Sequence, residues 1–254
     1  MTPTELFSVG FCAAILLYAC YSDLKTRTVS NKLWLLLLVV GLPLALYNWY
    51  LSGLSFLISL GYSIVFTTLL AYLFFHLNLF GGADAKALIG IALFIPTNPL
   101  FDAPFPDPFP FAITTLFNGA IISLLVFPVM FLYNAVKLPP SELRAHPGLT
   151  FVGYKRRIDT LASAKRTFQR LLHSYELTEE TSGVTVRRAL ALAGLEIDDD
   201  VITELKTYHE QGKIGDAVWV TPGLPYMLFI TTGFFFALFA GNLPFRIIMA
   251  LLSL

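Results

Sequence analysis

The chain has 254 residues, of which 56% are hydrophobic and 13% are charged, with no net charge. An ordinary soluble domain carries about 25% charged residues, and disordered chains are poor in apolar residues, so the composition excludes both classes. No basic tail or arm is present, which argues against a nucleic-acid partner. The sequence therefore predicts a polytopic membrane protein.

The charges are concentrated in one region. Residues 138–222 hold 11 of the 17 Lys and Arg residues and 12 of the 17 Asp and Glu residues. We therefore predict three parts: a transmembrane core of five helices over 1–137, a soluble insert over 138–222, and a last transmembrane helix with a tail over 223–254.

Six apolar segments are candidate spans, although the first and fourth are shorter than the roughly 20 apolar residues that a helix needs to cross a bilayer. In chain order they are Leu6–Tyr21, Leu33–Leu51, Leu54–Phe80, Ala85–Leu100, Phe111–Val136 and Gly223–Leu243. The turn between the second and third lies at Ser52-Gly53. The predicted fold class is an all-α membrane protein with six transmembrane helices and a mainly helical insert.

Within the insert, the pattern favours helices over Gly153–Tyr175, Val184–Leu195 and Asp200–Gln211, and a short strand over Gly215–Val220. Asp198, Asp199 and Asp200 are suited to cap the last of these helices.

The basic residues of the short loops predict the orientation, because such residues favour the cytoplasmic side. Lys25, Arg27 and Lys32 follow the first segment and Lys86 follows the third, whereas the loop 97–110 contains neither Lys nor Arg. We therefore expect a multi-pass protein of the cytoplasmic membrane, with its N-terminus outside and residues 138–222 in the cytoplasm. The N-terminus lacks the basic region of a signal peptide, so the first helix is expected to be retained.

Two aspartates are the main candidates for chemistry, since ionisable residues at membrane depth are rare and often functional. Asp23 follows the first predicted helix, and Asp84 precedes the fourth in Gly81-Gly82-Ala83-Asp84. Both are expected at the cytoplasmic face, where they can meet. Two neighbouring carboxyl groups tend to share one proton, which supplies an acid and a base without a metal or cofactor.

Each aspartate also has a purely structural interpretation. Asp84 can cap a helix, and Asp23 beside Lys25 can be an interfacial charge. The two glycines before Asp84 favour the functional interpretation, because they allow a substrate strand to approach the backbone closely.

The segments from Asp23 to Leu33 and from Phe80 to Leu88 resemble the two catalytic regions of the type IV prepilin peptidases, which are GxGD membrane aspartic proteases. The long insert resembles that of the archaeal preflagellin peptidases. The resemblance implies that Asp23 and Asp84 are catalytic. It also implies that the partners are pilin or archaellin precursors with class III-type signal peptides, cut at the cytoplasmic face. Ala83 replaces the second glycine of the family pattern, and it serves if that position needs only a small side chain.

Bacterial members of this family also N-methylate their product, and many have an N-terminal zinc motif. This sequence lacks that motif, so we expect no methyltransferase activity and no metal.

Several residues are weaker candidates for supporting roles. Lys25 and Lys86 each lie two residues after a candidate aspartate, where they can tune its pKa or hold a lipid phosphate, and Asn31 can cap the second helix. The basic run Lys155–Arg157 can bind anionic lipid headgroups. Pro222-Gly223-Leu224-Pro225 weakly resembles a presenilin motif, but we interpret it as a helix start.

Other functions remain open from the sequence. A presenilin-like or signal-peptide-peptidase-like protease would cut within a transmembrane helix. A proton- or cation-coupled transporter would use the aspartates as an ion site, although such sites usually lie near the bilayer midplane. An inactive scaffold that binds pilins is a third possibility. The sequence does not identify the precursor, the basic member of the pair or the oligomeric state.

Overall fold

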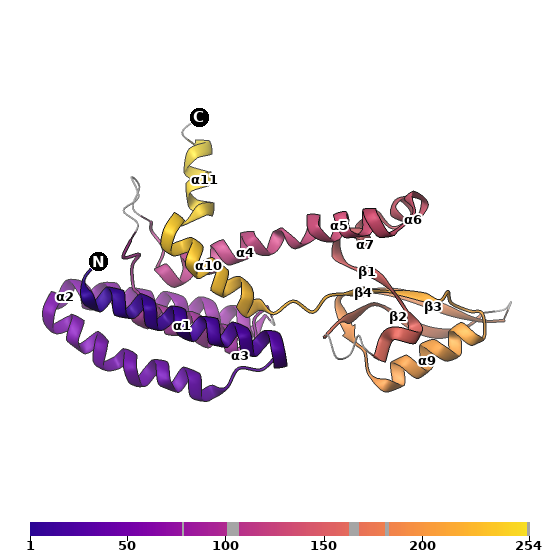
Figure 1. The fold of residues 1–254 in the computed structure, drawn as a ribbon, viewed down its shortest axis with the longest axis horizontal. Helices are drawn as coiled ribbons and strands as arrows, with labels where there is room; N and C mark the ends of the chain where they lie inside the picture. The colour runs from indigo at the N-terminus through magenta and orange to yellow at the C-terminus, as the bar shows by residue number, and fades with distance from the viewer. Residues whose placement is uncertain (78, 101–106, 163–167, 181–182, 253–254) are drawn as a thin grey trace. The chain divides into compact units, whose positions relative to one another are not determined.

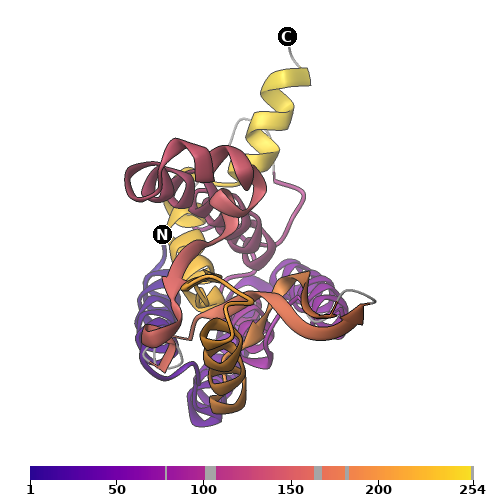
Figure 2. The same cartoon turned by 90° about the vertical axis from the view of Figure 1, so that its right-hand side faces the viewer.

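The computed structural model describes residues 1–77, 79–100, 107–162, 168–180 and 183–252. The chain divides into two compact units. Unit 1 comprises residues 1–124 and 225–254, and unit 2 comprises residues 125–224. Unit 1 is helical in its described residues, whereas unit 2 combines helices with a sheet (Figures 1 and 2).

Unit 1 contains six described helices. They are α1 (Pro3–Thr26), α2 (Asn31–His76), α3 (Gly82–Phe94), α4 (Phe111–Leu124), α10 (Tyr226–Ala240) and α11 (Leu243–Leu252). The start of α1 is a complete capping box, because the Thr2 hydroxyl accepts from the Glu5 N–H and the Glu5 carboxylate accepts from the Thr2 N–H. Such a box satisfies two of the donors that a helix start leaves unpaired.

Helix α2 is bent back on itself at Gly53. The backbone of Gly53 has φ +67° and ψ −149°, a conformation that is essentially restricted to glycine. Figure 1 shows the two arms of α2 running back along each other from this bend. The turn that the sequence predicted at Ser52-Gly53, between two apolar segments, is therefore present in the structure.

Glycines bring the helices of unit 1 into close contact. A Cβ atom on Gly41 of α2 would lie 2.6 Å from the Phe94 ring, and one on Gly90 of α3 would lie 2.6 Å from Leu37. At the crossing of α4 and α10, a Cβ atom on Gly119 would lie 2.5 Å from the Phe229 carbonyl oxygen. Such small residues let membrane helices pack backbone to backbone.

Three helical segments are long and apolar enough to cross a membrane. They are α1, α2 and the segment Phe111–Lys137, and the pair α10 and α11, bent by 52°, makes a fourth if it is counted as one span. Helix α3 has 13 residues and is therefore only about 20 Å long. The protein is thus a mostly helical membrane protein, and the count of six spans stays a prediction.

Unit 2 contains a four-stranded antiparallel sheet in the order β1-β4-β2-β3. Its described elements are α5 (Val126–Lys137), α6 (Pro140–Ala145), α7 (Pro147–Val152), β1 (Tyr154–Arg157), η1 (Ile158–Thr160), β2 (Arg170–Glu180), β3 (Gly183–Glu196), α9 (Asp199–Glu210) and β4 (Ala217–Thr221).

The prediction of a mainly helical insert is wrong. The expected helix Val184–Leu195 is the strand β3, and the expected helix Gly153–Tyr175 contains β1, η1 and the start of β2, with residues 163–167 outside the described part. The all-α fold class is corrected accordingly. The helix over 200–211 and the short strand near 215–220 are confirmed as α9 and β4.

The core of unit 2 forms between α9 and the sheet. Ile202, Leu205 and Tyr208 of α9 belong to one buried cluster with Val218 and Val220 of β4. Asp198 caps α9, because its carboxylate accepts from the Val201 N–H at 2.8 Å. The amphipathic sequence of α9 thus explains its place over the sheet.

Candidate active site

The sequence predicted that Asp23 follows the first helix. In the structure Asp23 lies inside that helix, α1. The helix continues to Thr26 and ends at Arg27, which has φ +57° and donates its N–H to the Asp23 carbonyl oxygen at 3.0 Å. The Asp23 carboxyl group is half-buried and interacts electrostatically with the Arg27 guanidinium. The end of α1 therefore holds a carboxyl group and a cation together.

Asp84 is the third residue of α3 and is 8% exposed. Its Oδ2 atom accepts a hydrogen bond from the Gly81 N–H at 3.0 Å, which is half of a capping box. The structural interpretation of Asp84 thus holds in part, although Gly81 is the N-cap residue. A Cβ atom on Gly81 would lie 3.2 Å from the same oxygen, so a glycine suits this contact.

The two aspartates lie within electrostatic reach of each other, because the Asp23 charge acts on the Asp84 carboxyl group. The end of α1 and the start of α3 therefore bring together two residues that are far apart in the sequence (Figure 1). In the described part of the chain, no group of three His, Cys, Asp or Glu side chains could hold a metal ion.

The start of α10 contributes two further groups, which the sequence interpretation missed. The Met227 N–H donates a hydrogen bond to Asp23, and the Tyr226 phenol interacts electrostatically with Asp84. The Tyr226 ring also packs against Phe80, with 5.1 Å between ring centroids.

The sequence feature that could have pointed to Tyr226 and Met227 is the motif Pro222-Gly223-Leu224-Pro225 directly before them. The helix start predicted there is confirmed, with Pro225 as the N-cap of α10. A helix start leaves its first N–H groups unpaired, so it is suited to bind a carboxylate.

The predicted supporting residues have different surroundings. Lys86 donates to the Asn31 side-chain oxygen at 2.7 Å and so joins the first turns of α3 and α2. Ser30, and not Asn31, caps α2. The Lys25 ammonium lies over the Tyr21 ring, 5.8 Å from its centroid.

Ala83 is the second residue of α3 and has a helical backbone. A glycine is therefore not required at this position. Gly81 is likewise outside the left-handed region, with φ −76°. The glycine motif thus provides space beside Asp84 and does not supply a strained turn.

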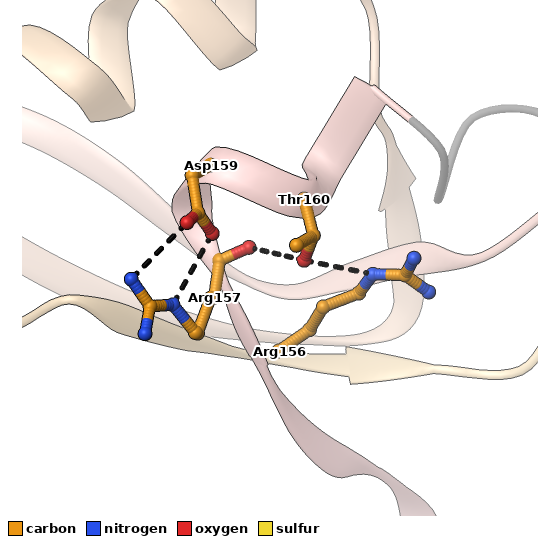
Figure 3. Close-up of polar contacts among 4 residues, drawn as sticks. All are labelled: Arg156, Arg157, Asp159 and Thr160. Atoms are coloured by element: carbon orange, nitrogen blue, oxygen red, sulfur yellow. Dashed lines mark hydrogen bonds and ion pairs between the residues drawn. The ribbon is translucent and has the colours of Figure 1, made fainter.

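In unit 2, the basic run Lys155–Arg157 already has protein partners. Lys155 pairs with Glu142 at 2.7 Å, and Arg157 pairs with Asp159 at 3.1 Å. Figure 3 shows the latter contact and the hydrogen bond from Arg156 to Thr160. Lipid binding by this run therefore stays a prediction, and it would compete with these contacts.

Two family profiles match the chain. Residues 10–136 match the type IV leader peptidase family, and residues 145–243 match the archaeal peptidase A24 C-terminus, type II. A preflagellin peptidase of Methanococcus voltae is 28% identical, over 92% of this chain and 95% of that protein. A preflagellin peptidase of Methanocaldococcus jannaschii is 23% identical, over 98% of this chain and 99% of that protein.

Proposed function

We infer that Asp23 and Asp84 are the catalytic pair of this protein, which belongs to the type IV leader peptidase family. The protein is a peptidase, and its substrate is a preflagellin. Both curated relatives are named preflagellin peptidase, and each matches this chain over nearly its whole length. The observation that supports the assignment of the pair is that the buried Asp84 carboxyl group lies within reach of the Asp23 charge.

The reaction follows from two carboxyl groups that share a proton. The ionised carboxylate removes a proton from a water molecule, which attacks the carbonyl carbon of the scissile peptide bond. The protonated carboxyl group donates its proton to the carbonyl oxygen. Collapse of the tetrahedral intermediate then expels the amine, which takes up the proton that the first carboxylate had removed from the water. A coupled pair titrates as a unit, so we assign neither role to one aspartate.

Backbone N–H groups at the starts of α10 and α3 donate to the two carboxyl groups. The Met227 N–H holds Asp23 in one orientation, and the Gly81 N–H holds one oxygen of Asp84. Positioned donors of this kind limit the reorganisation that the carboxyl groups undergo during reaction.

The substrate would approach beside Gly81 and Gly82, which are exposed. We propose that the short basic leader of the precursor lies in the cytoplasm and that the bond before its hydrophobic helix is cut. This places the pair at the cytoplasmic face, with six spans, the N-terminus outside and residues 138–222 in the cytoplasm. The positive charge of Lys25, Arg27 and Lys32 supports this orientation.

Cleavage of a tagged archaellin precursor in membranes that contain the protein tests the proposal. The wild-type protein is expected to release the leader, and Asp23→Asn and Asp84→Asn are expected to abolish release. Asp216→Asn, an exposed change in unit 2, serves as the matched control and is expected to cleave at the wild-type rate.

Mass spectrometry of the product identifies the cut bond. A cut at the junction of leader and helix supports the proposal, whereas a cut within the helix supports an intramembrane protease of the presenilin type. Wild-type activity of either aspartate variant would contradict the assignment of the pair.

A further inference from the structure

Unit 1 contains a second polar site, at the other end of its helix bundle from the aspartates. A pocket of about 240 Å³ lies between the start of α1, the bend of α2 and the end of α3, where its lining includes Ser8, Asn48, Ser59 and Phe94. Ser8 and Asp23 are 15 residues apart on α1, which is about 22 Å along the helix axis. The pocket is therefore separate from the aspartate pair.

One lining group is buried and has no hydrogen-bond partner among the described residues. Ser8 is 1% exposed, and its Oγ atom forms no hydrogen bond to any described residue. Buried hydroxyl groups in proteins nearly always have a partner, and an unsatisfied one costs about 1–3 kcal/mol. The Ser8 hydroxyl, at the wall of a polar pocket, is therefore available to pair with a ligand.

The remaining lining groups indicate the chemistry of the ligand. Serine hydroxyls and the Asn48 amide can each both donate and accept hydrogen bonds. Glu5 adds a carboxylate that is held in place, because it accepts a hydrogen bond from the Thr2 N–H at 2.6 Å. Phe56 and Phe94 supply two aromatic rings.

The charge and the size of the pocket restrict the chemical class of the ligand further. The described lining residues include no Lys, Arg or His, so a phosphate group would find no counter-charge there. The volume is much larger than one ion or water molecule needs. It is slightly below the range of roughly 300–1,000 Å³ that is typical for drug-sized ligands. A single sugar ring is uncharged and is of a size that suits this volume.

We propose that this pocket binds a neutral polyhydroxyl group, either the sugar headgroup of a glycolipid or a free sugar. The ring lies against an aromatic face, and its hydroxyl groups pair with Ser8, Asn48 and Glu5. The site sits at the end of the bundle that carries the loop after α3, which the predicted topology places outside.

Native mass spectrometry of the purified full-length protein tests this site. The protein is incubated with equal amounts of monoglucosyl dioleoylglycerol and dioleoyl phosphatidylglycerol, which differ only in the headgroup. We expect one glucosyl lipid to be retained at least tenfold more strongly than the phospholipid. Equal retention of the two lipids would overturn the proposal.

Two variants locate the binding. Ser59→Leu places a larger apolar side chain at the pocket wall and is expected to lose the preference for the glucosyl lipid while precursor cleavage continues at the wild-type rate. Ser123→Leu makes the same change at a half-buried serine of α4 outside the pocket and is expected to keep the preference. An unchanged preference in Ser59→Leu would overturn the proposal.

A third variant and a free sugar complete the test. Ser8→Ala removes the unpaired hydroxyl without adding volume, and it is expected to reduce the preference several-fold even if Ser59→Leu fails to fold. A Ser8→Ala protein with the full preference would contradict the role of this hydroxyl. Displacement of the lipid by methyl β-D-glucopyranoside would identify the sugar alone as sufficient, and no displacement would identify the lipid as the source.

Discussion

The crossing of α4 and α10 provides a quantitative test of the packing in unit 1. A Cβ atom on Gly233 would lie 2.3 Å from the Thr115 carbonyl oxygen and 2.6 Å from the Gly119 nitrogen, both of which are backbone atoms. Ordinary contact begins near 3.4 Å, so Gly233→Ala forces the two helices apart by about 1 Å. Overpacking of this kind costs about 1–3 kcal/mol.

The matched control is Gly61→Ala in α2, where no atom lies within 4 Å of the new Cβ. For a chain of this size, about 2 kcal/mol corresponds to a fall in Tm of roughly 4–8 °C. Thermal unfolding in detergent can be followed with a thiol-reactive dye, because Cys12 and Cys20 are free and buried and become accessible on unfolding. Equal Tm values for Gly233→Ala and Gly61→Ala would refute the reasoning.

Four further predictions concern the site and the topology. Met227→Pro removes the N–H that donates to Asp23 at a first-turn position that tolerates proline. The control variant Met227→Ala shortens the same side chain and keeps the N–H. We expect precursor cleavage to be about tenfold or more slower in Met227→Pro than in Met227→Ala. Equal rates for those two variants would show that this hydrogen bond has no role. Gly81→Ala places a Cβ 3.2 Å from Asp84 Oδ2 and is expected to lower the cleavage rate roughly tenfold by moving the carboxyl group. Ala83→Gly is expected to leave the rate unchanged, because Ala83 is helical, and a large gain in rate would contradict that expectation. In intact cells, a membrane-impermeant maleimide is expected to label Thr97→Cys but not Ser141→Cys, and the opposite pattern would reverse the predicted orientation.

The helices of unit 1 could largely be predicted, because long apolar segments have few alternatives in a membrane protein. The turn at Gly53 could be located from Ser52-Gly53 between two apolar segments. The number of spans could not be settled in the same way, since α3 has 13 residues and α10 bends by 52° at its junction with α11. Both features depend on packing between helices and not on apolar length.

The sequence predicted β4 of the unit 2 sheet but missed β3, because β3 carries helix-forming residues. Residues 184–195 contain several Ala, Leu and Arg residues, which favour a helix when they are considered alone. Residues 183–196 instead pair with β2 in the structure. Pairing with the neighbouring strand therefore overrides local propensity in this unit.

The sequence indicated Asp23 and Asp84 as a candidate pair, whose catalytic role stays a proposal, but it did not indicate the groups around them. Asp23 and Asp84 were evident as carboxylates at the ends of apolar segments. The Met227 N–H is a backbone group without a residue-specific signal, and its approach to Asp23 depends on how α10 packs against α1. The Ser8 hydroxyl, which has no partner among the described residues, likewise becomes visible only when its surroundings are known.

The central claim is that Asp23 and Asp84 act as one catalytic unit on a precursor. Single-turnover cleavage rates of the wild type, Asp23→Asn, Asp84→Asn and the double variant test it most directly. We predict that the double variant is no slower than either single variant, because removal of one member already disables a pair that acts as a unit. Losses that multiply, or substantial activity in one single variant, would contradict the account.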